Sequence, residues 1–399
     1  MADKIEPLAV TASSLVNACG VGELATIEAI KTEKSGLQQC GYPNLEFATW
    51  LGRVDGIENH PLEQALLNFT CRNNRLANLA LGVDGFRAKV SAATERYGAN
   101  RIGVFVGTST SGIEETEKAY REARKNNGVL AANYDLLATH NIASLLRYVQ
   151  KSLNLTGPGQ SISTACSSSA KVFAAAHRHI MSGLCDAAVV GGVDSLCLTT
   201  LYGFNSLQLV SSEICRPYDV RRKGINIGEA AGFALLERVE HGRGKVTLKG
   251  YGESSDAYHM SSPHPSGDGA ALAMNHALQR AGLTPGDIDY INLHGTATPS
   301  NDAAEGAGVM QIFDKIPLCS STKGFTGHTL GAAGITEAII SILALEHEIV
   351  PGNLNLQECD NSIAITPIQH TQAAALGNVM SNNFGFGGSN CSLVFGWYP

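Results

Sequence analysis

The chain has few charged and few aromatic side chains. Of its 399 residues, 16% are charged and 6% are aromatic, whereas 44% are hydrophobic. This composition excludes a disordered chain, because disorder goes with low hydrophobicity and high net charge. The net charge of −7 gives no reason to expect a nucleic-acid-binding protein. No window holds 18 uninterrupted apolar residues, so we expect no membrane-spanning helix.

The sequence also lacks the cysteine patterns of metal sites and disulfide frameworks. Its ten cysteines include no Cys-x-x-Cys pair and have no regular spacing, which excludes a zinc knuckle and argues against a disulfide scaffold. The N-terminal segment 1–7 is charged and has no apolar signal core. These absences predict a soluble cytoplasmic protein whose thiols are mostly free.

What the sequence does contain is an alternation of strands and helices. Short apolar runs typical of strands covered on both faces lie at 102–107, 187–193, 230–237, 288–294, 376–382 and 391–396. Helical patterns lie at 63–82, 113–126, 167–183, 269–281, 302–313 and 331–347. The alternation indicates an α/β architecture. A change of composition near 238–247 predicts two halves, 1–240 and 241–399.

Cys166 is the most informative single residue. It lies where a β-rich run passes into an Ala-rich helix, within Thr164-Ala-Cys-Ser-Ser-Ser169. The free N–H groups and the dipole of a helix N-terminus lower a thiol pKa, and we therefore expect a nucleophilic thiolate here. A purely structural turn is the alternative at this point. Cysteines in or beside apolar runs are expected to belong to the core: Cys185, Cys197 and Cys391.

Two histidines lie at similar element ends. His294 follows a predicted strand, and His328 lies in a glycine-rich loop before a helix. Active sites of α/β enzymes assemble at such loops. A histidine that is simply hydrogen-bonded within a loop is the alternative for each one alone. A cysteine and two histidines, all at element ends, together favour covalent catalysis.

A glycine-rich segment, Phe384-Gly-Phe-Gly-Gly-Ser389, joins the last two predicted strands. Alternating glycines allow sharp turns and the close approach of a ligand, and an aromatic ring between them can act as a gate. A plain hairpin turn is the alternative. The segment is not a phosphate-binding loop, because no Walker lysine follows it and it does not open a helix.

Four segments occur in an order that resembles a known enzyme family. They are Thr164 to Ser169, His294 to Thr298, Lys323 to Gly334 and Asn383 to Asn390. Together they are similar to the β-ketoacyl-acyl-carrier-protein synthases, the elongating condensing enzymes with a Cys-His-His triad, over almost the whole chain. The resemblance implies a thiolase-like fold of two similar α/β halves that form a five-layer αβαβα sandwich, with the cysteine in the first half and both histidines in the second.

The resemblance also implies a reaction and roles for the site residues. Cys166 would take an acyl chain as a thioester, and decarboxylation of malonyl-acyl-carrier protein would give the carbanion that attacks it, in fatty-acid or related polyene or polyketide biosynthesis. Neutral His294 and His328 would stabilise the negative charge that develops on the malonyl thioester. The backbone N–H groups of Cys166 and Phe386 would form an oxyanion hole, and Phe386, beside Phe384, would be a gate. Lys323 would organise charge around the histidines, and Glu337 would hold the site through hydrogen bonds. Thr296 and Thr298 would bind the phosphopantetheine arm.

No redox cofactor is implied, although members of the family often hold a structural monovalent cation. The residues in positions like its ligands are Asn292, Glu305, Glu337 and Ser381. Thr110 stands where the primary fatty-acid enzymes have glycine or isoleucine beside the acyl pocket. Together with the segment 254–260, this departure resembles synthases of specialised lipid or aryl-polyene pathways.

The implied partners are acyl carrier protein and a second subunit, either another copy or a homologue. Nucleic acid and membrane insertion are not expected. Because carrier proteins are acidic and this chain is net negative, docking requires a local basic patch. The candidates are Arg72 with Arg75, the stretch Lys118–Lys125 (Lys118, Arg121, Arg124 and Lys125), and Arg221–Lys223; we favour the second, which has four cations within two helical turns.

Two other functions remain open on the sequence. A thiolase-like acyltransferase would condense thioesters without decarboxylation and would use a second cysteine near the C-terminus, where Cys391 lies. A chain-length factor would shape the pocket of a heterodimer without catalysing a reaction. Such proteins generally lose the nucleophilic cysteine, which this chain keeps at Cys166.

Overall fold

The computed structural model describes residues 4–39, 41–239 and 245–398. Ten main strands form two sets of five. The first set lies in the order β5–β4–β6–β8–β1 and consists of β1 (Leu8–Asn17), β4 (Ile102–Gly107), β5 (Gly159–Ile162), β6 (Ala187–Asp194) and β8 (Ala230–Arg238). The second lies in the order β11–β10–β14–β15–β9 and consists of β9 (Val246–Ser255), β10 (Tyr290–Asn292), β11 (Leu318–Ser320), β14 (Asn378–Gly385) and β15 (Ser389–Trp397).

The two sets have the same topology. In the first, β4 runs parallel to β5 and β6, and β8 runs antiparallel to β6 and β1. In the second, β10 runs parallel to β11 and β14, and β15 runs antiparallel to β14 and β9. The sets join where β1 pairs with β9, with Leu8 opposite Leu248. Equal order and equal directions establish a structural repeat that the sequence only suggested.

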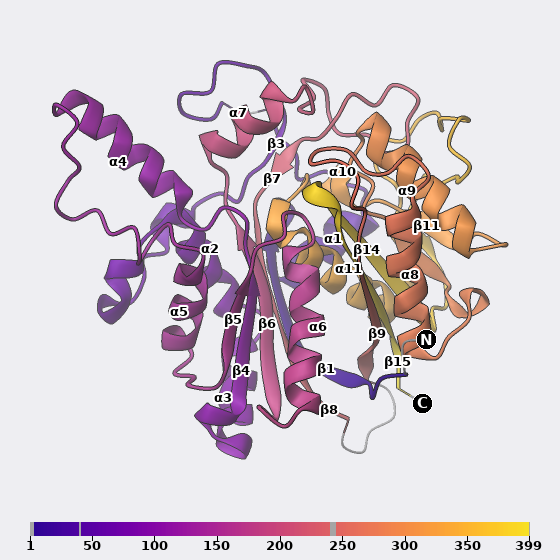
Figure 1. Cartoon of the computed structure of the whole chain (residues 1–399), viewed down its shortest axis with the longest axis horizontal. Coiled ribbons are helices and arrows are strands. Elements are labelled where there is room, and N and C mark those ends of the chain that lie inside the picture. Colours follow the sequence, from indigo (N-terminus) through magenta and orange to yellow (C-terminus); the bar gives the residue numbers. More distant parts are fainter. Residues whose placement is uncertain (1–3, 40, 240–244, 399) are drawn as a thin grey trace.

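Helices complete a stack of five layers (Figure 1). Two helices lie between the sheets: α6 (Ser168–Met181) and α11 (Ala333–His347). The outer face of the first sheet is covered by α2 (Arg72–Leu81), α3 (Phe86–Tyr97) and α5 (Ala143–Ser152). The outer face of the second is covered by α8 (Asp268–Ala281) and α9 (Pro299–Ile312). The predicted αβαβα sandwich is therefore confirmed.

The core follows these layers. One apolar cluster surrounds the two central helices, and one further cluster lies beneath each outer helix layer. The central helices touch through small residues: a Cβ on Gly334 would lie 2.2 Å from the backbone nitrogen of Ala170. The segment Leu330–His347 is long and apolar enough to cross a membrane, but 89% of it is buried inside the fold, as a core helix would be.

The remaining described elements are short or peripheral. The other helices are α1 (Glu23–Lys31), α4 (Ile113–Lys125), α7 (Leu198–Ser206) and α10 (Lys323–Thr326). The minor strands are β2 (Gly20–Val21), β3 (Leu51–Gly52), β7 (Ile227–Gly228), β12 (Ile349–Val350) and β13 (Gln372–Ala373). Short 3₁₀ segments lie at Ile57–Asn59, Gln64–Phe69, Ala99–Arg101, Pro285–Asp287, Leu330–Ala332 and Phe386–Gly388.

One predicted helix was wrong and the domain boundary is not tested. The expected helix 63–82 is a 3₁₀ turn over Gln64–Phe69 followed by α2, because the chain is extended at Cys71. The Cys71 sulfur accepts a hydrogen bond from the Asn74 N–H and so caps α2 at 3.4 Å. The predicted boundary between residues 240 and 241 lies in the segment 240–244, outside the described residues.

Candidate active site

Cys166 lies in the turn that connects β5 to α6. The turn is tight: Ala165 has a positive φ of 52°, and the Ser168 hydroxyl accepts a hydrogen bond from the Thr164 N–H at 2.9 Å. The helix begins two residues after the cysteine, as expected, and the N–H groups of Ser168 and Ala170 bond to the backbone oxygens of Ala165 and Ser167. The side chain is almost fully enclosed, with 5% exposure, at the inner end of a pocket.

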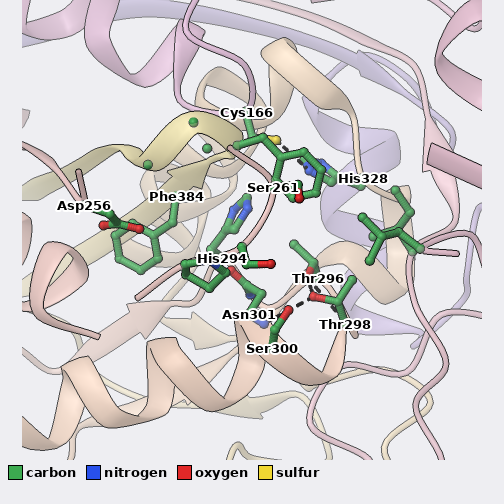
Figure 2. Close-up of a pocket in the computed structure, with 18 of the residues that line it drawn as sticks. Cys166, Asp256, Ser261, His294, Thr296, Thr298, Ser300, Asn301, His328 and Phe384 are labelled. Carbon is green, nitrogen blue, oxygen red and sulfur yellow. Dashed lines mark hydrogen bonds between the residues drawn. The ribbon is translucent and has the colours of Figure 1, made fainter. Parts of the chain in front are cut away.

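The two histidines come from the other half of the molecule and meet at this sulfur. His294 follows β10, and His328 follows α10. The Nε2 atom of His328 lies 3.0 Å from the Cys166 Sγ atom, and the two imidazole centroids are 5.3 Å apart at an angle of 84°. Figure 2 shows both rings directed toward the same part of the pocket as Cys166. The structure therefore brings all three predicted residues together.

The hydrogen bonds of the rings assign their tautomers. The Nδ1 atom of His328 accepts from the Leu330 N–H at 3.3 Å, and the Nδ1 atom of His294 faces the Lys323 ammonium at 3.3 Å. An imidazole nitrogen that accepts a hydrogen bond carries no proton, so in each neutral ring the proton lies on Nε2. Both Nε2–H groups are then donors into the pocket. The His328 group donates toward the sulfur rather than removing its proton.

Burial keeps both rings neutral. It lowers the pKa of His294 well below the usual range, and the nearby Lys323 charge and His328 lower it further. Burial and Lys323 likewise hold the pKa of His328 well below its usual range. Two neutral donors aimed at one point are suited to stabilising an oxyanion, which agrees with the role implied by the sequence resemblance.

The expected lowering of the cysteine pKa is wrong. Burial raises the pKa of the Cys166 thiol to about 11, and the Lys323 charge and the Phe386 N–H offset that effect only in part. The free thiol is therefore protonated at neutral pH. The sequence showed the helix terminus but not the depth at which the sulfur is buried.

Lys323 and Glu337 form a buried ion pair behind His294. Lys323 has no exposed surface, and its ammonium donates to the Glu337 carboxylate and, at 2.5 Å, to the His294 backbone oxygen. Burial raises the pKa of Glu337. The Lys323 charge and, to a smaller extent, the Asn383 amide offset part of that rise. This pair fixes both the backbone and the Nδ1 side of His294, which accounts for the predicted importance of both residues.

Glu305 anchors the same loop from the opposite side. Its carboxylate accepts the backbone N–H groups of His294 and Gly295, each at 2.8 Å, and the Tyr218 hydroxyl at 2.8 Å. Burial raises the pKa of Glu305 to about 7. The carboxylate thus sets the direction in which the His294 loop leaves β10, whether or not it also binds a cation.

The predicted gate and pantetheine residues line the pocket. Phe386 and Gly387 lie in the hairpin between β14 and β15, which confirms the predicted turn; the gate stays a prediction. Thr296 and Thr298 line the entrance and share a hydrogen bond of 2.9 Å (Figure 2). Phe384 packs on His294 with ring centroids 6.1 Å apart.

Two other sequence interpretations change. Thr110 does not line the described pocket, because its hydroxyl donates to Asp194 at 2.8 Å. Cys391 lies on β15 with no exposed surface and is likewise not part of the described pocket, so it does not supply a second reactive thiol there. Cys185 and Cys197 are fully buried, as predicted.

Sequence reasoning missed Asp194. This fully buried carboxylate ends β6 and accepts hydrogen bonds from Thr108, Ser109 and Thr110 and, at 2.6 Å, from the Gly331 N–H. Gly331 follows Leu330, whose N–H fixes the His328 tautomer. Asp194 therefore ties the loop after β4 to the histidine loop of the other half. A carboxylate that ends a run of apolar and glycine residues, Ala187 to Asp194, was the available signal.

Comparisons with known proteins agree with this site. The family model described as "Beta-ketoacyl synthase, N-terminal domain" matches residues 84–242, and "Beta-ketoacyl synthase, C-terminal domain" matches residues 246–357. The 3-oxoacyl-[acyl-carrier-protein] synthase 2 of Vibrio cholerae is 35% identical over 317 residues, which is 74% of this chain and 76% of the relative. The mitochondrial 3-oxoacyl-[acyl-carrier-protein] synthase of Arabidopsis thaliana is 36% identical and covers 76% of this chain and 70% of its own.

Solved structures resemble the fold along its whole length. The ketosynthase ApeO, solved in complex with its chain length factor ApeC from Xenorhabdus doucetiae, has a TM-score of 0.90, 36% identity and 98% coverage of both chains. A β-ketoacyl synthase from Burkholderia phymatum has a TM-score of 0.87 and 27% identity, covering 99% of this chain and 100% of its own. The chain belongs to the β-ketoacyl synthase family, and its activity is the decarboxylative condensation that builds a 3-oxoacyl thioester.

Proposed function

We propose that Cys166 carries the growing acyl chain and that His294 and His328 drive the decarboxylation of a malonyl group. The observation that carries this proposal is the convergence of the Cys166 sulfur and two neutral Nε2–H donors at one end of one pocket. The polar entrance and apolar inner wall suit a thioester on a flexible pantetheine arm, with Thr296 and Thr298 contacting the arm.

In the first step, the Cys166 sulfur attacks the carbonyl carbon of an acyl thioester. The new C–S bond forms, the old C–S bond breaks, and the thiol proton ends on the sulfur of the released pantetheine. The Phe386 N–H, which points at the sulfur, and the Cys166 N–H at the helix terminus form the oxyanion hole. His328 stabilises negative charge on the sulfur through its Nε2–H.

In the second step, a malonyl thioester loses carbon dioxide, and the electron pair of the broken C–C bond becomes an enolate. The Nε2–H groups of His294 and His328 stabilise its oxygen, in a site where burial makes such bonds strong. The enolate carbon attacks the Cys166 thioester. A C–C bond forms, the C–S bond breaks, and the cysteine leaves as a thiolate that takes a proton from water.

The pocket favours this reaction over the two alternatives. A non-decarboxylating thiolase-like transfer needs a second thiol, and Cys391 lies on β15 away from the pocket. A chain-length factor would not need the nucleophile that this site encloses. We propose an acyltransferase of the 3-oxoacyl-carrier-protein synthase type that acts in the cytoplasm, in line with the nine free cysteines among the described residues.

We also propose that a monovalent cation binds beside the second sheet. The residues fit an oxygen-ligated ion, because the buried Ser381 hydroxyl has no hydrogen-bond partner and Asn292 lies next to it in the β10–β14 pairing. The Glu305 carboxylate and the Glu337 backbone oxygen, which accepts a bond from Asn292, complete the set. Such an ion would fix the loop that carries His294. No redox cofactor is required by the two steps above.

We propose an acidic acyl carrier protein as the partner that delivers both substrates. One arginine in each of the other two candidate groups is engaged inside the fold, whereas Arg221 and Lys223 stay exposed. Arg72 is 8% exposed and pairs with Glu229, so it holds the fold together rather than facing a partner. Arg222 is equally enclosed and pairs with Asp360 at 2.6 Å.

The basic face of α4 remains the best docking site. Lys118 and Lys125 pair with glutamates of their own helix, whereas Arg121 and Arg124 form no ion pair with the acidic residues that the structure describes. Charge reversal at both arginines should raise the KM for carrier-bound acyl groups and leave a small acyl thioester unaffected. An unchanged KM with both substrates would contradict carrier docking at α4, whereas equal loss with both would indicate a folding defect.

We further propose that the chain works as a dimer with another copy or with a homologous subunit. Strand β5 is an open edge of the first sheet, with Gly159 and Gln160 exposed, and such an edge can pair with a second strand. The ketosynthase ApeO at 36% identity was solved with a chain length factor, which supports a heterodimer. A specialised, aryl-polyene-like pathway is proposed from the sequence at Thr110 and at 254–260. Native mass measurement of the chain alone, and with a homologue expressed beside it, decides between the two.

The proposal is tested by intact-mass measurement after incubation with an acyl-carrier protein. A gain of one acyl group on the wild type and none on Cys166→Ala is expected. Addition of malonyl-carrier protein should then release the acyl group as a product two carbons longer. Acylation of the Cys166→Ala variant to the wild-type level would overturn the assignment.

A further inference from the structure

Helix α7, which is mostly not buried, contacts the proposed gate residue Phe386. Its Phe204 ring packs on the Phe386 ring with centroids 5.4 Å apart, and both residues line the pocket that ends at Cys166. Phe386 lies in a hairpin of three residues, of which Gly387 has a positive φ of 80°. The Phe386 ring is therefore held on a tight glycine turn and contacts the Phe204 ring of α7.

Helix α7 does not hold itself in place by burial. Of its nine residues Leu198–Ser206, one, Leu201, is buried. Its N-cap residue, Cys197, provides no side-chain capping bond, and its first turn has no acidic residue. Leu201 and Phe204 pack into an apolar cluster, whereas the first turn of the helix depends on polar contacts from neighbouring segments.

Glu117 of α4 supplies the missing cap. One carboxylate oxygen accepts the Thr199 N–H at 2.6 Å and the Thr199 hydroxyl at 2.7 Å, and the other accepts the Leu198 N–H at 3.2 Å. A carboxylate at this place satisfies free N–H groups and faces the positive end of the helix dipole. In Figure 1, α4 leans out from the body of the protein and α7 lies between it and the second half.

We propose that Glu117 is a positioning residue for the Phe386 gate. It fixes the first turn of α7, and α7 in turn holds Phe204 against Phe386. Without Glu117 the helix shifts, Phe386 loses its lateral contact, and the Cys166 sulfur is uncovered more often. The inference rests on the proposed function only in taking Cys166 as the residue that the gate covers.

The test measures how fast iodoacetamide alkylates Cys166 in the full-length protein, by peptide mass spectrometry. Glu117→Ala should raise the rate roughly 3- to 10-fold, the effect expected from losing one cap. Glu117→Gln keeps one acceptor oxygen and should give a smaller rise. The matched control is Glu122→Ala on the same helix, whose carboxylate binds Lys125 at 2.8 Å and not α7; its rate should equal that of the wild type.

A second pair of variants tests whether Glu117 acts on Phe386 through Phe204. Phe204→Ala should accelerate alkylation as Glu117→Ala does, and the double variant should be no faster than Phe204→Ala alone. Additive effects, or a wild-type rate in Glu117→Ala, would overturn the proposal. So would equal acceleration at the buried Cys319, because that would indicate general loosening. The assay uses neither carrier protein nor turnover, so a failure of acyl transfer to Cys166 would be seen separately.

Discussion

Substitutions in the buried ion pair Lys323–Glu337 should affect stability and activity differently. In Lys323→Met, the Glu337 carboxylate keeps the Asn383 amide and loses its cation. A buried charge without its partner costs about 3–5 kcal/mol of unfolding free energy. The double variant Lys323→Met/Glu337→Gln removes both charges and should regain most of that stability, since the site is then neutral.

The loss of stability in Lys323→Met should increase as the pH rises. Burial already raises the pKa of Glu337, and without Lys323 it rises further above the unfolded value. The folded variant then holds a proton that the unfolded chain releases, so its stability falls as pH rises from the unfolded pKa toward the raised one. Urea unfolding at pH 5.5 and pH 8 should show a larger deficit at pH 8, and the double variant should lose this slope.

Activity should not follow stability. Lys323 also faces Nδ1 of His294 and donates to its backbone oxygen, contacts that neither methionine nor glutamine replaces. Decarboxylation of malonyl-carrier protein should therefore fall about 10²–10³-fold in both variants, as for loss of one oxyanion donor. A double variant that recovers decarboxylation along with stability would refute the orienting role of Lys323. A double variant as unstable as Lys323→Met would refute the charge argument.

Three further predictions follow from the site. His294→Ala and His328→Ala should each slow malonyl decarboxylation about 10²–10³-fold while acyl loading suffers less, and a wild-type decarboxylation rate in either would contradict the assignment. Asp194→Asn should lower the urea midpoint and slow decarboxylation, because Gly331 loses a charged acceptor; unchanged values in both assays would show that this carboxylate does not hold the histidine loop. Because burial raises the pKa of Cys166 to about 11, its alkylation rate should rise about tenfold per pH unit from pH 7 to 9, and a plateau below pH 9 would contradict that shift.

The sequence predicted which residues form the site because each lies at the end of a regular element. Cys166 precedes a helix, His294 follows a strand, and His328 follows a glycine turn, all of which are local patterns. The contact between Cys166 and His328 is not local. It depends on β5 and α10 of opposite halves meeting around the central helices, and the family resemblance rather than any pattern supplied that expectation.

The sequence could not predict how deeply each side chain is buried or which polar groups far apart in the chain are in contact. The sign of the Cys166 pKa shift was wrong because burial outweighs the helix terminus. The helix 63–82 was wrong because a cysteine sulfur caps α2 at Cys71. Asp194 and Glu117 act on segments far along the chain, on Gly331 and on α7; the end of the apolar run at Asp194 marks a candidate residue, but no local pattern indicates either partner.

Burial has opposite consequences for the two half-reactions. The enclosed site holds His294 and His328 neutral, and each neutral ring offers one Nε2–H donor to the enolate. Charged imidazolium rings would also be donors, but burying their charge would cost desolvation free energy. The same enclosure disfavours the Cys166 thiolate and so opposes acyl loading. The donors that point at the sulfur, the Phe386 N–H and the His328 Nε2–H, counter this effect locally. Because one of them belongs to the hairpin between β14 and β15, we expect the position of Phe386 to affect the reactivity of the thiol as well as access to it.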